Sequence, residues 1–102
     1  MARPAVHPGE FLADELAELA ITPTELARQI AVPANRITQI IQGKRSISGD
    51  TALRLGHWFG TSPQFWLNLQ AIFDLRVAEK SLGPALKQLP TKQMLPGNPA
   101  GP

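Results

Sequence analysis

The chain has 102 residues, enough for one compact domain, and its hydrophobic fraction of 43% can supply a folded core. It contains no cysteine, which excludes disulfides and thiolate metal sites and suits a reducing cytoplasm. It has no run of about 18 apolar residues, and the first nine residues lack the apolar stretch of a secretory signal. We therefore expect a cytoplasmic protein without a membrane partner.

The net charge is only +2, but the charges are unevenly distributed. The first quarter of the chain is acidic, with the carboxylates Glu10, Asp14, Glu15, Glu18 and Glu25. Between residues 28 and 54 a single carboxylate, Asp50, stands against the cations Arg28, Arg36, Lys44, Arg45 and Arg54. Such a local excess of cations can attract a polyanion, although a solvated helix face would show the same pattern.

Apolar residues recur at helical spacing, and we predict five helices and no strand. The first covers residues 8–19, after His7 as a cap, and the second covers residues 23–30. The second begins at a capping box in which the Thr22 hydroxyl accepts from the Glu25 N–H while Glu25 reaches back to the Thr22 N–H. The third covers residues 33–42, the fourth begins at Ser48 and ends at Gly60, and the fifth covers residues 63–79.

The composition changes after residue 79, since residues 80–102 hold five of the ten prolines and few apolar residues. We predict a domain over residues 1–79 and a mobile tail over residues 80–102, with one helical turn near residues 84–89.

The second and third helices, with the tight turn between them, have the spacing of a helix-turn-helix unit over residues 23–42. The predicted inward-facing residues are Leu26, Ala27, Ile30, Val32, Ile37, Ile40 and Ile41. Ala31 occupies the turn position where glycine is usual, and we expect a positive φ there at a cost of about 1 kcal/mol.

The outward face of the third helix is rich in amides and hydroxyls and carries no carboxylate, a combination suited to the DNA major groove. We expect Asn35, Thr38 and Gln39 to read bases, and Arg36, Lys44 and Arg45 to contact phosphates. The complete set of predicted DNA-binding residues is Thr22, Thr24, Pro33, Ala34, Asn35, Arg36, Thr38, Gln39, Gln42, Lys44 and Arg45.

Several segments of the chain also resemble one family of regulators. They are HPGEFL at residues 7–12, LA at 26–27, NRI at 35–37, GKR at 43–45, SGDTALRL at 48–55 and FGTSPQFWLNLQ at 59–70. Together they are similar to the HigA antitoxins, of the Xre/Cro helix-turn-helix type. The resemblance implies an all-α, five-helix fold like that of lambda repressor and a homodimer. It also implies repression of the protein's own operon and neutralisation of a HigB/RelE-like ribonuclease toxin.

The fifth helix is apolar nearly all round, which is typical of a central core helix or of a dimer interface. Because so small a domain has little interior, we favour the dimer. The predicted interface residues are Phe65, Trp66, Leu69, Ile72 and Phe73. A two-fold dimer would set two reading helices about 34 Å apart, and this predicts a palindromic operator.

No arrangement of residues supports an enzyme or a cofactor. His7 and His57 lie on different predicted helices without metal-ligand spacing; we expect His7 to cap a helix and His57 to be exposed. The rival readings are a solitary repressor without a toxin and a helical protein-binding domain that has lost DNA binding.

Overall fold

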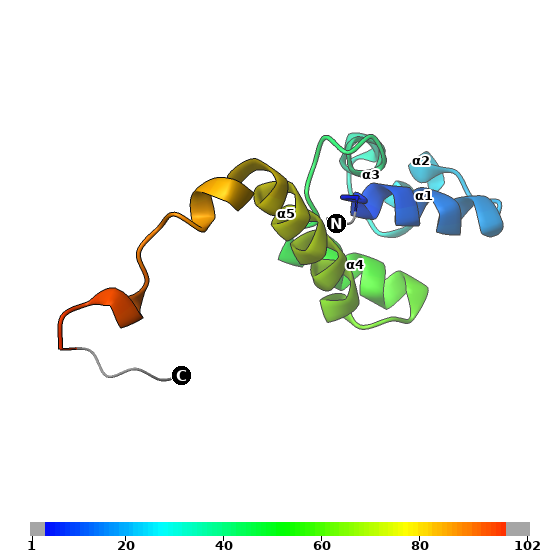
Figure 1. The fold of residues 1–102 in the computed structure, drawn as a ribbon. Coiled ribbons are helices and arrows are strands. Elements are labelled where there is room, and N and C mark those ends of the chain that lie inside the picture. The colour runs from blue at the N-terminus through cyan, green and yellow to red at the C-terminus, as the bar shows by residue number, and fades with distance from the viewer. Residues whose placement is uncertain (1–3, 98–102) are drawn as a thin grey trace.

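The computed structural model of the protein describes residues 4–97, and all regular structure in that range is helical. The helices are α1 (Pro8–Glu18), α2 (Pro23–Gln29), α3 (Ala34–Ile41), α4 (Gly49–Phe59), α5 (Pro63–Leu86) and a short 3-10 helix, η1 (Lys92–Met94). In Figure 1 the first four helices gather around the start of α5, and the rest of α5 runs away from them. The prediction of an all-helical protein with five α-helices is confirmed.

Most helix starts follow the signals in the sequence. Side-chain oxygens of Thr22, Ser48 and Ser62 cap α2, α4 and α5, each accepting from a backbone N–H three residues further on. The Nδ1 atom of His7 caps α1 by accepting from the N–H of Gly9 at 2.9 Å, as expected for this histidine. The N-cap of α3 is Pro33, which makes no such bond.

The capping box at the start of α2 is only half formed. Thr22 Oγ1 accepts from the Glu25 N–H at 3.1 Å, but the Glu25 carboxylate binds the side chains of Arg28 and Gln29. These bonds, that to Arg28 above all, lower the pKa of Glu25 to about 2. A charged guanidinium one turn along the helix is a stronger partner for a carboxylate than a backbone N–H, which explains the difference from the prediction.

Buried apolar side chains from all five α-helices and from the loops between them form one core. Its members are Leu12, Leu16, Leu26, Ala27, Ile30, Val32, Ile37, Ile40, Ile47, Ala52, Leu55 and Trp66. They include the residues predicted to face inward from the helix-turn-helix, except that Ile41 is half-buried at the edge of the core. The spacing of apolar residues therefore identified the correct faces of α2 and α3.

The first half of α5 belongs to this core. Trp66 is only 1% exposed, and its indole Nε1 donates to Thr61 Oγ1 at 3.0 Å. Phe65 and Leu69 are half-buried against the core, and the ring of Phe73 packs on that of His7 at 4.8 Å. All four are predicted interface residues; within the chain Trp66 is buried in the core, and Phe65, Leu69 and Phe73 are half-buried. The excess of apolar residues in this part of α5 has an intramolecular use.

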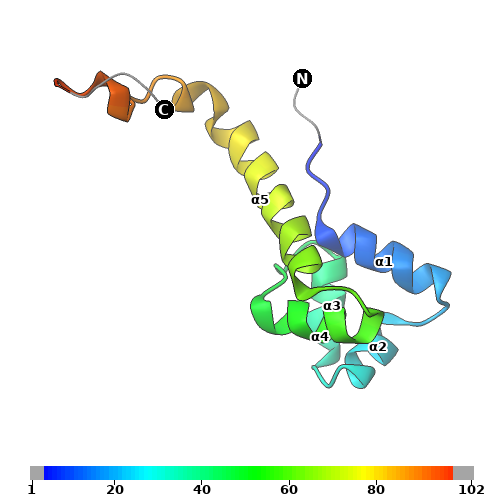
Figure 2. The same ribbon diagram turned by 90° about the horizontal axis from the view of Figure 1, so that it is seen from below.

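The second half of α5 is longer than predicted and exposed. The helix continues to Leu86, so the expected domain boundary at residue 79 falls within it. Strong helix formers such as Lys80 and Leu82 carry it on, while Pro84 stands in its last turn, where only one backbone bond is lost. Figure 2 shows α5 extending beyond the other helices, and the described molecule measures 59 × 24 × 21 Å.

The N-terminal three residues of the predicted domain and residues 98–102 of the predicted tail lie outside the described residues. Within residues 4–97 no helix combines the length and the apolar content that a membrane span requires.

Candidate nucleic-acid interface

The turn between α2 and α3 fixes how the helix-turn-helix presents α3. The N–H of Val32 donates to the Ala27 carbonyl at 3.0 Å, and the N–H of Ala31 donates to the Arg28 carbonyl at 3.2 Å. This is the Schellman pattern, in which the residue after the helix cap takes a left-handed backbone. Ala31 takes it with φ of 59°, as its position in the sequence predicts.

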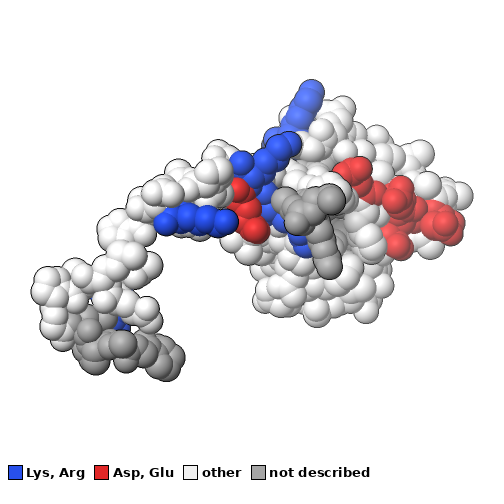
Figure 3. All heavy atoms as spheres, in the orientation of Figure 1, with Lys and Arg blue, Asp and Glu red and all other residues white. Residues whose placement is uncertain are grey.

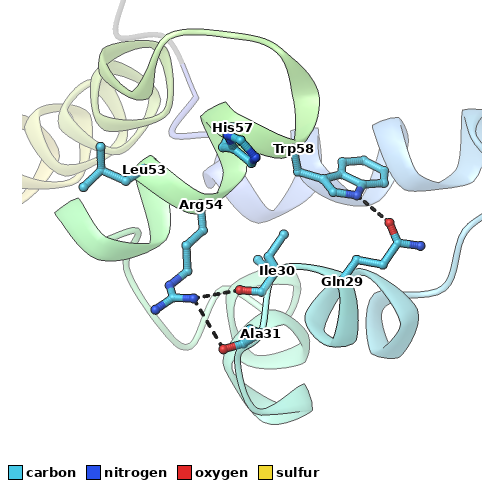
Figure 4. A pocket seen from close by; sticks show the side chains of 7 residues that line it. All are labelled: Gln29, Ile30, Ala31, Leu53, Arg54, His57 and Trp58. Atoms are coloured by element: carbon cyan, nitrogen blue, oxygen red, sulfur yellow. Dashed lines mark hydrogen bonds between the residues drawn. The ribbon is translucent and has the colours of Figure 1, made fainter.

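Helix α4 supports the same turn from outside the motif. Arg54 donates through Nη1 to the carbonyls of Ile30 and Ala31, at 2.8 and 3.4 Å, and Trp58 Nε1 donates to Gln29 Oε1 at 2.6 Å. Figure 4 shows these contacts around a cavity of about 310 Å³ between α4 and the end of α2. This role of Arg54 and Trp58 does not follow from the sequence, because their partners lie 24 and 29 residues away in the chain.

The outward face of α3 has the predicted chemistry. Ala34, Asn35 and Gln42 are exposed, and Thr38 and Gln39 are half-buried. Residues 34–42 include no carboxylate. At the start of the motif Thr22 and Thr24 are exposed, and Pro33 is exposed at the start of α3. The structure therefore brings the predicted base-reading residues together on one accessible helix face.

The cations near α3 differ in how they are held. Arg36 binds Asp50 at 2.7 Å, with its side chain 28% exposed, and Asp50 also accepts from Arg54 Nε at 2.8 Å. The hydrogen bond from Arg54, followed by the contacts of Arg36, lowers the pKa of the Asp50 carboxyl. Without DNA, Arg36 is therefore paired with a carboxylate of α4, and its contact with phosphate stays a prediction. Lys44 and Arg45 are exposed in the connection between α3 and α4.

The charges are segregated over the surface in Figure 3. In this view most carboxylates gather over the α1 side, and the cations lie over the middle of the molecule and along α5, with a second group of carboxylates between them. The uneven distribution in the sequence thus becomes an uneven surface, which favours one side for a polyanion.

The HPGE segment holds α1 against α3. A Cβ atom on Gly9 would lie 1.9 Å from the Ile40 carbonyl oxygen, so only glycine permits this approach. The ring of His7 lies between Gly43 and Phe73. Burial lowers the pKa of His7, although the charges of Asp74 and Glu10 act in the opposite direction.

Gln70 ties the connection between α3 and α4 to α5. Its side chain is 6% exposed; Oε1 accepts from the N–H of Ile47 at 2.8 Å and Nε2 donates to Asp74 at 2.9 Å. The connection that carries Lys44 and Arg45 is thereby anchored.

Nothing in the described part of the chain suggests a metal centre. Residues 4–97 contain no group of three or more His, Cys, Asp or Glu able to hold an ion. His57 is exposed on α4, away from the cap formed by His7.

Known proteins similar to this chain include antitoxins and helix-turn-helix regulators. A HigA-family antidote protein from Coxiella burnetii superposes with a TM-score of 0.86 at 47% identity, over 87% of this chain and 98% of that one. Pseudomonas aeruginosa antitoxin HigA, solved with the higBA promoter, has a TM-score of 0.84 at 41% identity, over 90% of this chain and 100% of that one. Antitoxin HigA-1 of Vibrio cholerae is 35% identical over 74 residues, which are 72% of this chain and 70% of that protein.

No protein-family model matches the chain. The agreement in sequence and fold covers 72–90% of this chain and so extends well beyond the helix-turn-helix. The chain belongs to the HigA family of helix-turn-helix antitoxins.

Proposed function

We propose that this protein is the antitoxin of a type II toxin-antitoxin system, that it represses its own operon by binding operator DNA through α3, and that it neutralises a RelE-like ribonuclease toxin. The observation that carries the DNA-binding part is the exposed, carboxylate-free amide and hydroxyl face of α3. In support, the relative from Pseudomonas aeruginosa is named as an antitoxin with its promoter, and antitoxin GraA as a complex with its operator.

Base reading by Gln39 is tested by Gln39→Ala. We expect the free energy of binding to the operator to become less favourable by about 1–3 kcal/mol. The preference for one base should be lost at one position of each half-site. The readout is fluorescence anisotropy with operator duplexes that differ at single positions. Gln64→Ala, the same change on the exposed start of α5, is the matched control and should leave binding unchanged. Intact affinity and preference in Gln39→Ala would show that another face reads the DNA.

The toxin-binding part rests on the family. Expression of the neighbouring gene alone should stop the growth of the host cells. Co-expression with this chain should restore that growth and yield a complex of the two proteins that purifies as one species. A neighbour that is neither toxic nor bound would leave a solitary repressor as the better description.

We further propose a cytoplasmic homodimer that binds a palindromic operator. The support comes from exposed apolar residues on one side of α5: Ile72, Leu75, Leu82 and Leu86 are 44–62% exposed. Of the interface residues predicted from the sequence, Ile72 is the one that stays exposed at 49%. A second copy is a natural cover for an apolar helix face of this length.

A further inference from the structure

Gln39 is held by a second side chain from beyond its own helix. Its Oε1 atom accepts a hydrogen bond from Arg45 Nε at 2.9 Å. A guanidinium group has donors only, so the atom of the amide that faces Arg45 must be the oxygen. The contact therefore identifies the amide oxygen of Gln39 as the atom next to Arg45 and places the N–H₂ group on the other side.

The backbone places Arg45 at this point. After the Gln42 cap, Gly43 takes φ of 75°, its N–H donates to the Ile40 carbonyl at 3.0 Å, and the Lys44 N–H donates to the Gln39 carbonyl at 2.8 Å. This Schellman turn reverses the chain over the last turn of α3 and brings Arg45 back beside Gln39. The bond of Gln70 to Ile47 anchors the same connection from its other end.

We propose that Arg45 is a specificity-determining positioning residue: it fixes the Gln39 amide so that Gln39 presents its N–H₂ group to the major groove. This inference rests on the proposed operator binding. Within residues 4–97 the Nε2 atom of Gln39 has no hydrogen-bond partner, so both of its donors are free for a base.

The orientation selects among bases. Guanine offers two acceptors in the major groove, N7 and O6, and matches a group with two donors. Bidentate pairing of glutamine with adenine needs the amide oxygen to accept from N6 as well. Since Arg45 draws that oxygen towards the connection after α3, guanine is favoured over adenine at the position facing Gln39.

The test begins with the full chain and a random-sequence duplex library, from which the preferred site is selected. The position read by Gln39 is the one where Gln39→Ala loses preference. Duplexes with each of the four bases there are then titrated against wild type, Gln39→Ala, Arg45→Ala, the double variant and Lys44→Ala. Lys44→Ala is the matched control, since it removes one exposed cation from the same connection without touching Gln39.

We expect wild type to prefer guanine over adenine by about tenfold. Arg45→Ala should bring this ratio towards one, whatever it does to overall affinity, and should not change the ratio further in the Gln39→Ala background. Lys44→Ala should weaken binding to all four duplexes and reduce the salt dependence while keeping the wild-type ratio.

Salt-sensitive binding with a wild-type ratio in Arg45→Ala, or a wild-type preference for adenine, would overturn the inference alone. If the wild-type chain selects no duplex and binds DNA without salt dependence, the proposed function fails and the inference with it. Thermal unfolding of each variant checks that a changed ratio does not reflect a misfolded protein.

Discussion

Two alanines take the left-handed backbone that normally belongs to glycine. Ala20 has φ of 54° and follows α1, and Ala31 has φ of 59° in the turn of the helix-turn-helix. This conformation is higher in free energy for an L-residue other than glycine, because its Cβ crowds the following carbonyl. The motif identified Ala31 in advance, whereas nothing in the residues around Ala20 singled it out.

Replacing Ala31 by glycine should therefore stabilise the fold. We expect Ala31→Gly to raise the free energy of unfolding by about 1 kcal/mol, since relief of the strain outweighs the greater freedom of glycine in the unfolded chain. Urea denaturation measures the change. Ala34→Gly, in the first turn of α3 with ordinary helical backbone, should instead lower stability by about 0.5–1 kcal/mol. Equal effects of the two variants would argue against strain at Ala31.

His7 makes the stability of the fold depend on pH. Its pKa is lowered from 6.5, chiefly by burial, and its Nδ1 must stay unprotonated to accept from Gly9. As the pH falls below 6.5 the unfolded chain takes up a proton on His7 before the folded chain does, so stability decreases until the pH is below the folded pKa.

His7→Asn keeps a capping oxygen but cannot titrate in this range. The advantage of wild type over His7→Asn in free energy of unfolding should shrink as the pH is lowered through 6.5, measured by urea denaturation at several pH values. His57→Asn, on the exposed face of α4, serves as the control and should follow the wild-type curve. A constant difference between wild type and His7→Asn would show that the cap does not depend on its protonation.

At the scale of elements, close contacts between the backbones of neighbouring helices determine how those helices pack. The sharpest is between the start of α1 and the end of α3, at Gly9 and Ile40. Gly9→Ala must push these two helices apart, because the contact is with backbone, which cannot rotate away. We expect a loss of about 3 kcal/mol in the free energy of unfolding.

The matched control is Gly49→Ala at the start of α4, where a Cβ would meet nothing within 4 Å. Its effect should stay within about 0.5 kcal/mol. If the two variants unfolded at the same urea concentration, the α1–α3 approach would be looser than this structure has it.

Between elements, α4 and α5 hold the turn before α3 and the connection after it, although they follow α3 by many residues. Arg54 caps the end of α2, and Gln70 holds the loop that follows α3. The sequence predicts that both lie on helices, but not these contacts, since they span 24 and 23 residues. Helical periodicity relates residues only a few positions apart, so it cannot predict these contacts.

At the scale of the whole molecule, α5 carries two functions along its length. Near its start Trp66 fills the core, and from Ile72 to Leu86 it leaves a row of apolar side chains exposed. If that row is a dimer interface, Ile72→Glu should convert the dimer into a monomer in analytical ultracentrifugation, because the introduced carboxylates would be buried against apolar partners. Leu19→Glu, at an equally exposed leucine after α1, should remain dimeric. A monomeric wild type, or a dimeric Ile72→Glu, would contradict this assembly.

The sequence by itself determined the presence of the five α-helices, most of their N-terminal caps, the buried faces of α2 and α3, and the carboxylate-free outward face of α3 with Asn35, Thr38 and Gln39. These depend on neighbours within about one or two turns of helix, so residue types and spacing suffice to predict them. Only the tertiary structure decided that Arg36 is paired with Asp50, that Arg45 holds Gln39, and that Trp66 belongs to the core. Each of these depends on which segments meet in space: the reversal of the chain at Gly43 brings Arg45 against the Gln39 side chain.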